Sequence, residues 1–524
     1  MSTGLLQQLA DYGAFHDEEQ GYIDVADVFA AGNSVSPSDT SLYAVPRRSN
    51  RFGVWVAIAA VVLTVLLIGV IPFLVGNEET PPADTVVPTS LAESTPTTLT
   101  ESTPTTIGEL VLIPGTWSRV LHDEGVFGDK VPFTGGMRDI TVGGPGLVAV
   151  GEGDDGATVW TSVDGITWSR VPHDEAVFGG GNTMSSVTRG GAGLVAVGGG
   201  AGPEHERDSG DAAVWTSVDG ITWSRVPHDD SVFGGERQQQ MASVVAGGPG
   251  LVAVGWDTSG GTPDAAVWTS VDGFTWSRVP HDEAVFGGEG EQMMNSVTVG
   301  GPGLVAVGSA GFLEFDKGQL TDYDDFTGVA AVWTSVDGLT WSRVSNDDAV
   351  FGGEGNQWMN DVTTAGAALV AVGGDWSSAA HHAAVWTSVD GITWSRVPND
   401  EAIFGGEEHD QLMLSVTPAG SALVVVGRAW AQSGGDHSEG SDDSAASVWT
   451  SDDGATWSWF GFDEAVFGSE DNSSFLLSDG PVFTEYRQFM SGVTATASGV
   501  VAVGADWSGP SHGAAVWMVV SEAD

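Results

Sequence analysis

The chain has 524 residues, of which 75 are glycine and only 17% are charged, and this composition disfavours long helices and favours short strands joined by many turns. The formal net charge of -53 argues against nucleic acid as a partner, because so acidic a surface repels phosphates. The acidity could attract cations or basic proteins, and the alternative is that it only keeps the protein soluble, as in a salty medium. The sequence contains no cysteine, which excludes disulfides and thiolate metal sites.

Residues 1–50 are predicted to form a cytoplasmic, mostly disordered tail. Leu5, Leu9 and Tyr12 fall on one helical face and predict a short amphipathic helix, whereas the remainder is polar and acidic. The alternative is that this tail binds a cytoplasmic partner, which would make the protein a transmembrane sensor that signals through residues 1–50.

Residues 54–75 are predicted to form one transmembrane helix. The 22 residues from Val54 to Val75 carry no charge, and at ~1.5 Å per residue such a helix is about 33 Å long, enough to cross a bilayer. Arginines precede this run and glutamates follow it, which places the N-terminus in the cytoplasm and the C-terminal part outside. A cleaved signal peptide is the competing interpretation, but both the leading segment and the apolar run are too long for one.

Residues 77–112 form a Thr/Ser/Pro-rich segment in which Glu93–Thr98 is repeated at Glu101–Thr106. Prolines stiffen such a segment, and its polar residues cannot form a core. We therefore expect a stalk that lifts the following domain off the membrane.

Residues 113–520 contain three strand motifs that each occur seven times. They resemble Leu147–Gly151, Val159–Ser162 and Thr167–Val171, and a fourth, weaker strand resembles Met184–Thr188. A repeat of roughly 50–65 residues, rich in glycine and β-formers, is typical of a propeller blade. The fold class predicted is all-β, a seven-bladed β-propeller of four-stranded blades.

The order of the motifs also predicts how the ring closes. The first Thr-Trp strand, at Thr116, has no partner before it, and the last Val-Trp strand, at Val516, has none after it. We expect the N-terminal strand to join the C-terminal blade as its outer strand, since closure protects exposed sheet edges.

A short turn motif separates the third and fourth strands in six of the repeats. Its copies are Ser162–Trp168, Ser217–Trp223, Ser270–Trp276, Ser335–Trp341, Ser388–Trp394 and Ser451–Trp457. The motif resembles the Asp-box, or bacterial neuraminidase repeat, of sialidases, sortilin-type receptors and many non-enzymatic propellers. The resemblance implies a hairpin turn remote from any active site. It also implies a structural role for Asp164, Asp219, Asp272, Asp337, Asp390 and Asp453.

Local chemistry favours the same structural role. An aspartate in a tight turn accepts backbone N–H bonds, and the following glycine adopts a conformation that a Cβ resists. The Trp160 and Trp168 positions account for 14 of the 21 tryptophans and are expected in the core. Arg170 and its copies lie two residues after the second tryptophan, where we expect them to stack on aromatic rings or pair with acids.

Each outer strand is followed by an element like His122–Gly128, which predicts a one-turn helix with Asp as its N-cap. A metal site built from His173, Asp174 and Glu175 is disfavoured, because the histidine is replaced in other copies and the copies are dispersed around the ring.

The loops between the second and third strands differ most between repeats, and variable loops on a rigid scaffold usually carry recognition. Four of them hold a tryptophan, at Trp256, Trp376, Trp430 and Trp507, which are the candidate ligand-binding residues. The alternative is that each ring seals the top of its blade. Acidic clusters at 154–155, 322–325 and 436–443 would suit a loosely bound calcium ion, but none has the spacing of a dedicated calcium loop, and no cofactor is expected.

These features favour a non-enzymatic binding or scaffold module for a cell-surface protein or carbohydrate. The alternative is a sialidase-like glycoside hydrolase, for which the resemblance implies three arginines, a Tyr nucleophile paired with a Glu, and an acid/base Asp. The Arg-Ile-Pro motif of those enzymes is absent. Tyr486 is flanked by Glu485 and Arg487, but neighbours on a strand point to opposite faces, so Glu485 and Tyr486 would not pair.

Overall fold

The computed structural model describes residues 117–128, 135–200, 210–235, 237–312, 315–316, 319–320, 327–353, 355–376, 381–406, 409–431, 444–460, 466, 488–507 and 513–520. All of them belong to one compact unit, Ser102–Asp524. The predicted tail, membrane helix and stalk lie outside the described residues. Within the described part of the chain, no helix has the length and apolarity needed to cross a membrane.

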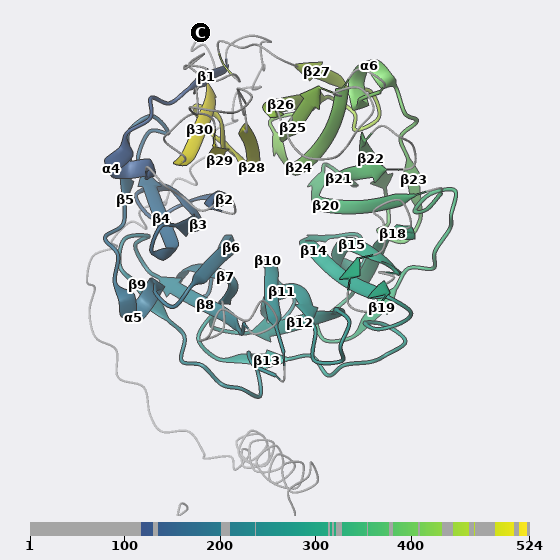
Figure 1. Cartoon of the computed structure of the whole chain (residues 1–524), viewed down its shortest axis with the longest axis horizontal. Coiled ribbons are helices and arrows are strands. Elements are labelled where there is room, and N and C mark those ends of the chain that lie inside the picture. The colour runs from purple at the N-terminus through teal and green to yellow at the C-terminus, as the bar shows by residue number, and fades with distance from the viewer. Residues whose placement is uncertain are drawn as a thin grey trace, which may run out of the picture. The chain divides into compact units, whose positions relative to one another are not determined.

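Seven four-stranded antiparallel sheets surround one central axis (Figure 1). The strands β2, β6, β10, β14, β20, β24 and β28 are innermost, and the short fourth strands lie on the outside. This arrangement confirms the predicted all-β, seven-bladed propeller of four-stranded blades.

We number the blades in chain order. Blade I contains β2 (Gly136–Gly143), β3 (Gly146–Gly153), β4 (Gly156–Ser162) and β5 (Trp168–Arg170). Blade II contains β6 (Asn182–Gly190), β7 (Gly193–Gly200), β8 (Ala212–Ser217) and β9 (Trp223–Arg225). Blade III contains β10 (Gln239–Gly247), β11 (Gly250–Asp257), β12 (Asp264–Ser270) and β13 (Trp276–Arg278). Blade IV contains β14 (Glu291–Gly300), β15 (Gly303–Phe312), β18 (Thr327–Ser335) and β19 (Trp341–Arg343).

Blade V contains β20 (Asn356–Ala365), β21 (Ala368–Trp376), β22 (His382–Ser388) and β23 (Trp394–Arg396). Blade VI contains β24 (His409–Ala419), β25 (Ala422–Ala431), β26 (Ser444–Ser451) and β27 (Ser458–Phe460). Blade VII contains β28 (Gln488–Thr496), β29 (Gly499–Asp506), β30 (Gly513–Val520) and β1 (Trp117–Arg119). Between β15 and β18, strands β16 (Phe315–Asp316) and β17 (Gln319–Leu320) pair with each other.

Blade VII joins the two ends of the described chain. Strand β1 pairs antiparallel with β30, with Trp117 opposite Val519 and Arg119 opposite Trp517. The unpaired first Thr-Trp strand and the unpaired last Val-Trp strand therefore meet in one sheet.

The innermost strands are longer than their sequence pattern indicates. Strand β6 extends from Asn182 to Gly190, beyond the predicted Met184–Thr188. Its register with β7 shifts between Met184 and Ser186, and the inner strand of every blade has a bulge at the equivalent place. A bulge interrupts the alternation of inward and outward side chains, which explains why the inner strand looked weak in the sequence.

The core lies between neighbouring blades. Trp215 in β8 is fully buried among residues of blades I and II, such as Val159 and Met184. Its indole N–H donates to the carbonyl of Val177, 2.7 Å away, in the segment that follows blade I. The tryptophans at this position in all seven blades donate in the same way to the preceding segment. Each blade is thus attached to the one before it by an apolar contact and a hydrogen bond.

One-turn helices follow three of the outer strands, as the sequence predicts. They are α4 (Glu124–Phe127), α5 (Glu175–Phe178) and α6 (Glu401–Phe404), each with an Asp N-cap that accepts a backbone N–H and a phenylalanine 4% exposed. After the outer strand of blade II, the Phe233 N–H donates to the Asp229 carbonyl at 2.8 Å, and this segment forms a turn instead of a helix.

The six Ser-x-Asp-Gly turns share one hydrogen-bond pattern. In the first copy, Asp164 Oδ1 accepts the N–H groups of Ile166 and Thr167 at 2.9 and 2.7 Å, and Gly165 has a φ of 79°. The Trp168 indole N–H closes the turn by donating to the Gly165 carbonyl at 2.8 Å. Backbone donors lower the pKa of the equivalent Asp219, to about 2. The turn is therefore rigid, and its carboxylate is ionised at neutral pH.

Candidate functional site

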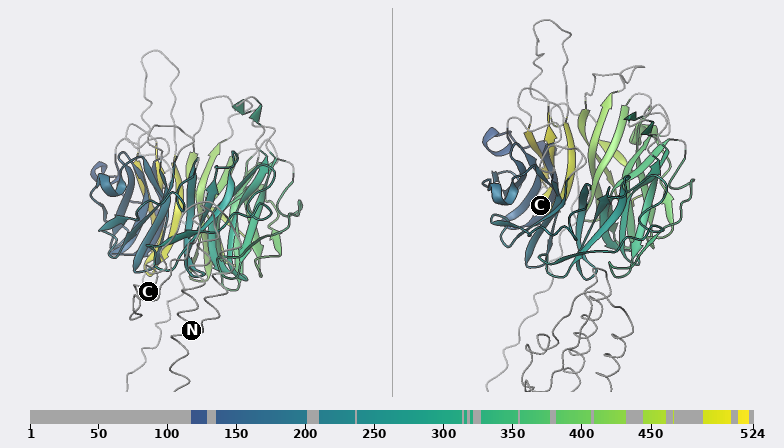
Figure 2. Two further views of the ribbon diagram at one scale, coloured as in Figure 1. Left: turned by 90° about the horizontal axis from the view of Figure 1, so that it is seen from below. Right: turned by 60° about the horizontal axis from the view of Figure 1, so that its bottom comes forward.

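The propeller has two unlike faces, and the left view of Figure 2 shows it edge-on with the strands running between them. We call the face with the six Ser-x-Asp-Gly turns and the hairpins from first to second strands the turn face. The opposite face, with the loops between second and third strands and the connections to the next blade, is the loop face. All four candidate tryptophans lie at the loop face, because each is at the end of a second strand or just past it.

The same chain of contacts between a Gln, an Asp, an Arg and a Trp, which we call the relay, occurs in blades III, V and VII near the loop face. In blade III the amide of the buried Gln239 donates to Asp257 at 2.9 Å, Asp257 pairs with Arg278 at 2.5 Å, and the Arg278 guanidinium lies 5.4 Å from the centre of the Trp268 ring. Gln357–Asp375–Arg396–Trp386 and Gln488–Asp506–Arg119–Trp517 repeat it. The predicted arginine role is confirmed in these blades, where the side chain both stacks and pairs.

The charge balance of the relay is visible at Asp257. Burial alone would raise the pKa of this carboxyl, but hydrogen bonds from Ser259 and Gln239 and the charge of Arg278 lower it below its ordinary value. Asp375 and Asp506 directly precede Trp376 and Trp507. The relay therefore holds the strand ends that carry two of the candidate residues.

An aromatic cluster, defined as Trp358, Trp376, His381 and Trp430, bridges blades V and VI on the loop face. Trp376 stacks on His381 with ring centres 4.1 Å apart and an interplanar angle of 21°, and it meets the edge of Trp358 at 4.9 Å. His381 lies 5.8 Å from Trp430 of the next blade. All four rings are half-buried, so each keeps part of its surface open to solvent.

Polar groups surround this cluster. Asp410, only 2% exposed, accepts the backbone N–H of His381 at 2.7 Å, and its second oxygen lies 3.6 Å from the His381 ring nitrogen Nδ1. The Arg428 guanidinium lies 5.0 Å from the centre of the Trp430 ring. Asp410 therefore holds His381 in place, and flat apolar rings beside a charged donor can bind the apolar face of a ligand while hydrogen-bonding its polar edge.

The structure brings together only two of the four tryptophans predicted from sequence. Trp376 and Trp430 meet through His381, whereas Trp507 of blade VII pairs with Phe489 at 5.0 Å. Trp256 lies apart in blade III, opposite Gln240 and Ala265. All four are half-buried.

Sequence reasoning missed Trp358, His381 and Asp410, and it singled out Arg428 only for the sialidase alternative, as an arginine outside the repeated strand position. One signal was available, since Trp376, Trp430 and Trp507 each stand three residues after the glycine that faces the buried methionine of the inner strand. This common position places them at the same height on consecutive blades.

A second unpredicted feature is a pair of aspartates at the bulges of the inner strands. Asp139 in β2 accepts the backbone N–H of Val187 from blade II at 2.8 Å. Asp361 in β20 accepts hydrogen bonds from Ser296 of blade IV and from Ser415 and Val416 of blade VI. Burial raises the pKa of Asp139 to about 6, backbone and side-chain donors oppose this, and the charge of Asp361 adds to it. Burial also raises the pKa of Asp361.

We expect Asp139 to contribute a component of the unfolding free energy that falls as pH rises from about 4 to 7. The folded pKa, about 6, exceeds the ordinary 3.8, so this component is fully present below 3.8 and lost as pH rises through 6. It amounts to at most about 3 kcal/mol. Urea denaturation of wild type and Asp139→Asn between pH 4.5 and 7.5 measures it, and parallel pH profiles for the two proteins would contradict it.

Within the part of the chain that the structure describes, one group of side chains could hold a metal ion. Ligand atoms of Asp264, His281 and Glu283 all lie within 4.8 Å of one another on blade III, although His281 and Glu283 are exposed. The disfavoured set of His173, Asp174 and Glu175 has structural contacts instead, because Asp174 caps α5 and His173 lies 3.1 Å from Glu175. Of the predicted calcium clusters, Asp155 lies 3.9 Å from Arg170, and the other two lie outside the described residues.

The residues implied by the sialidase alternative are only partly described. Tyr486, Glu485 and Arg487 lie outside the described part of the chain. Arg189 ends near the turn face at the close of β6, whereas Arg428 lies toward the loop-face end of β25. These two arginines therefore cannot form one carboxylate clamp.

Comparisons with known proteins concern the fold alone. No protein-family model matches the chain, and no curated protein matches it. Among solved structures, Trypanosoma rangeli sialidase in complex with sialic acid matches at 12% identity and a TM-score of 0.38, over 78% of this chain and 60% of the sialidase. Bombyx mori β-fructofuranosidase in complex with sucrose matches at 11% identity and a TM-score of 0.30, over 53% of this chain and 59% of the enzyme. Kuenenia stuttgartiensis hydrazine synthase matches at 9% identity and a TM-score of 0.33, over 62% of this chain and 76% of the synthase.

Proposed function

We propose that this chain is a membrane-anchored, extracytoplasmic β-propeller that binds a cell-surface glycan through the aromatic cluster and has no catalytic role. The observation that carries the proposal is the contact of Trp376, His381 and Trp430 across two blades, with Arg428 and Asp410 beside them. A sugar ring offers an apolar C–H face for an indole and hydroxyls for charged partners. The predicted anchor at 54–75 and the stalk at 77–112 would hold the domain outside the cell, with the N-terminus in the cytoplasm.

The test is a glycan array probed with the full chain, followed by titration of the best ligand. We expect Trp376→Ala and Trp430→Ala each to weaken binding about tenfold, or about 1.4 kcal/mol. Trp256→Ala is the matched control, because Trp256 is also half-buried on the loop face but lies outside the cluster. Equal affinities for all three variants would contradict the proposal.

Two other outcomes are distinguishable. A blank array together with a surface protein whose binding needs Trp376 and Trp430 would make the ligand a protein rather than a glycan. Hydrolysis of a fluorogenic sialoside that is abolished by Tyr486→Phe would favour the sialidase-like alternative.

A further inference from the structure

The turn face exposes an unusual amount of apolar surface. Of the thirteen large apolar side chains that are exposed among the described residues, ten lie on the Ser-x-Asp-Gly turns of blades I to V, with exposed fractions of 51% to 79%. They are Val163, Ile166, Val218, Ile221, Val271, Phe274, Val336, Leu339, Val389 and Ile392. The turns need their Ser, Asp, Gly, Thr and Trp for the hydrogen bonds, so the turn geometry does not account for these apolar residues. Apolar patches of this kind mark interaction sites on soluble domains.

Turns on this face pack closely against the first hairpin of the preceding blade. Gly191, in the hairpin between β6 and β7 of blade II, has a φ of 57°. A Cβ at this residue would lie 2.4 Å from the carbonyl oxygen of Asp272 in the turn of blade III. Gly144, Gly248 and Gly301 pack in the same way on the following blade's turn. A rigid apolar surface loses little conformational entropy when a partner binds.

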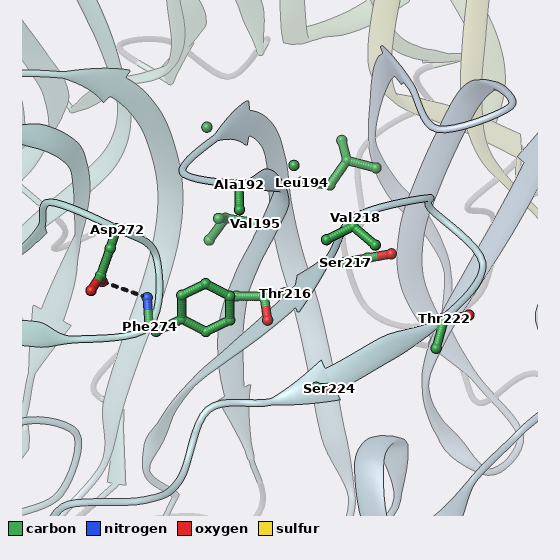
Figure 3. A pocket seen from close by; sticks show the side chains of 12 residues that line it. Ala192, Leu194, Val195, Thr216, Ser217, Val218, Thr222, Ser224, Asp272 and Phe274 are labelled. Carbon is green, nitrogen blue, oxygen red and sulfur yellow. Dashed lines mark hydrogen bonds between the residues drawn. The ribbon is translucent and has the colours of Figure 1, made fainter.

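A hollow of about 180 Å³ lies between the turns of blades II and III. Leu194, Val195 and Val218 of blade II line it together with Phe274 of blade III, and Asp272 stands beside Phe274 (Figure 3). A cavity of about 150 Å³ accepts a benzene ring, so this one has room for one large aliphatic or aromatic side chain. Phe274 is the sole aromatic residue at its position in the six turns, which makes this wall particular to blade III.

The charges at the hollow select the partner. Asp219 and Asp272 lie on the two turns beside it, and backbone N–H donors from the turn lower the pKa of both carboxyls. Both therefore stay ionised at neutral pH. The net charge of -53 disfavours a second copy of this chain and any anionic surface. The two ends of the described chain, β1 and β30, also reach this face, but they do so on blade VII. Neither end therefore lies at the hollow between blades II and III.

We propose that the turn face of blades II and III binds a protein segment that presents one large apolar side chain flanked by lysine or arginine. The apolar side chain fills the hollow against Phe274, and the flanking cations lie over Asp219 and Asp272. This surface is on the opposite side of the propeller from the aromatic cluster, so the proposal does not depend on the proposed glycan site.

The probe is the peptide Gly-Ser-Lys-Lys-Trp-Lys-Lys-Ser-Gly with a fluorinated indole, titrated by fluorine NMR against the full chain in zwitterionic nanodiscs. We expect Phe274→Ser and Val218→Ser each to weaken binding about fivefold or more, and replacement of the peptide Trp by Ala to weaken it about tenfold. Leu121→Ser is the matched control, because Leu121 is 80% exposed but follows an outer strand at the loop face, and it should leave binding unchanged.

Three results would overturn the proposal. They are no binding of the peptide to wild type, equal affinity for the Trp and Ala peptides, and equal affinity for wild type and Phe274→Ser. The first would mean that this chain's own residues or another occupant already cover the face, and the second that the net charge alone attracts the peptide. A dimer in sedimentation that Phe274→Ser dissociates would identify a second copy as the occupant instead. Thermal unfolding of each variant, expected to match wild type, separates lost binding from lost folding.

Discussion

Replacing Asp361 by alanine should destabilise the propeller by about 3 kcal/mol, because one half-buried carboxylate satisfies donors from three blades. Its Oδ1 accepts Ser296 Oγ at 2.7 Å and the Val362 N–H at 2.8 Å, and its Oδ2 accepts Ser415 Oγ at 3.1 Å and the Val416 N–H at 2.8 Å. Alanine would leave these groups beside an apolar methyl, where water cannot replace every lost bond. The measurement is the unfolding free energy of the full chain in urea.

Ser243→Ala provides the matched control for Asp361→Ala. Ser243 occupies the same bulge position in blade III, but its hydroxyl accepts only the Val297 N–H of blade IV, at 3.3 Å. We expect this variant to lose about 1 kcal/mol. If the two variants were equally stable, Asp361 would not connect three blades as the hydrogen bonds indicate.

The repeat pattern made the architecture predictable from sequence. Seven copies of the Val-Trp strand determined the number of blades, since each Trp215 equivalent must be buried against the preceding blade. The unpaired copies at Thr116 and Val516 required the ring to close through one shared sheet, and β1 does pair with β30. These inferences depend on local periodicity and chain order, which a sequence displays directly.

The lateral contacts were not predictable in the same way. His381, which directly precedes β22 of blade V, contacts both Trp376 and Trp430 of blade VI, and no periodicity in the sequence indicates such a contact between blades. Asp361 was obscured because a bulge breaks the alternation of its strand. An alignment of the repeats would have indicated the position, since serine occurs two residues after the strand methionine in four repeats and aspartate in two. An aspartate at a position where four other repeats have serine adds a carboxylate there, and its effect on the unfolding free energy can be measured.

Asp506→Ala should destabilise the propeller by about 3 kcal/mol and release its outermost N-terminal strand. Asp506 in β29 pairs with Arg119 of β1 and accepts from Gln488 of β28, and Arg119 covers Trp517 in β30. This one carboxylate therefore contacts side chains of two other strands of the blade that closes the ring. Without it, Arg119 would be a partly buried cation that has lost its acidic partner, and β1 is only three residues long. Hydrogen exchange at Trp117–Arg119 would report the release.

Asp257→Ala is the control for Asp506→Ala. It removes the same ion pair from a blade that does not close the ring. Asp257 has the same partners in blade III, Arg278 and Gln239, but there the outer strand β13 follows β12 directly through a Ser-x-Asp-Gly turn. We expect a similar loss of unfolding free energy, with no faster exchange in β13 than in the rest of the blade. The turn keeps β13 close to β12 when the ion pair is gone, since the chain between them is short, whereas β1 and β30 are joined by no turn. Equal exchange in β1 and β13 across the two variants would mean that backbone pairing alone holds the ring closed.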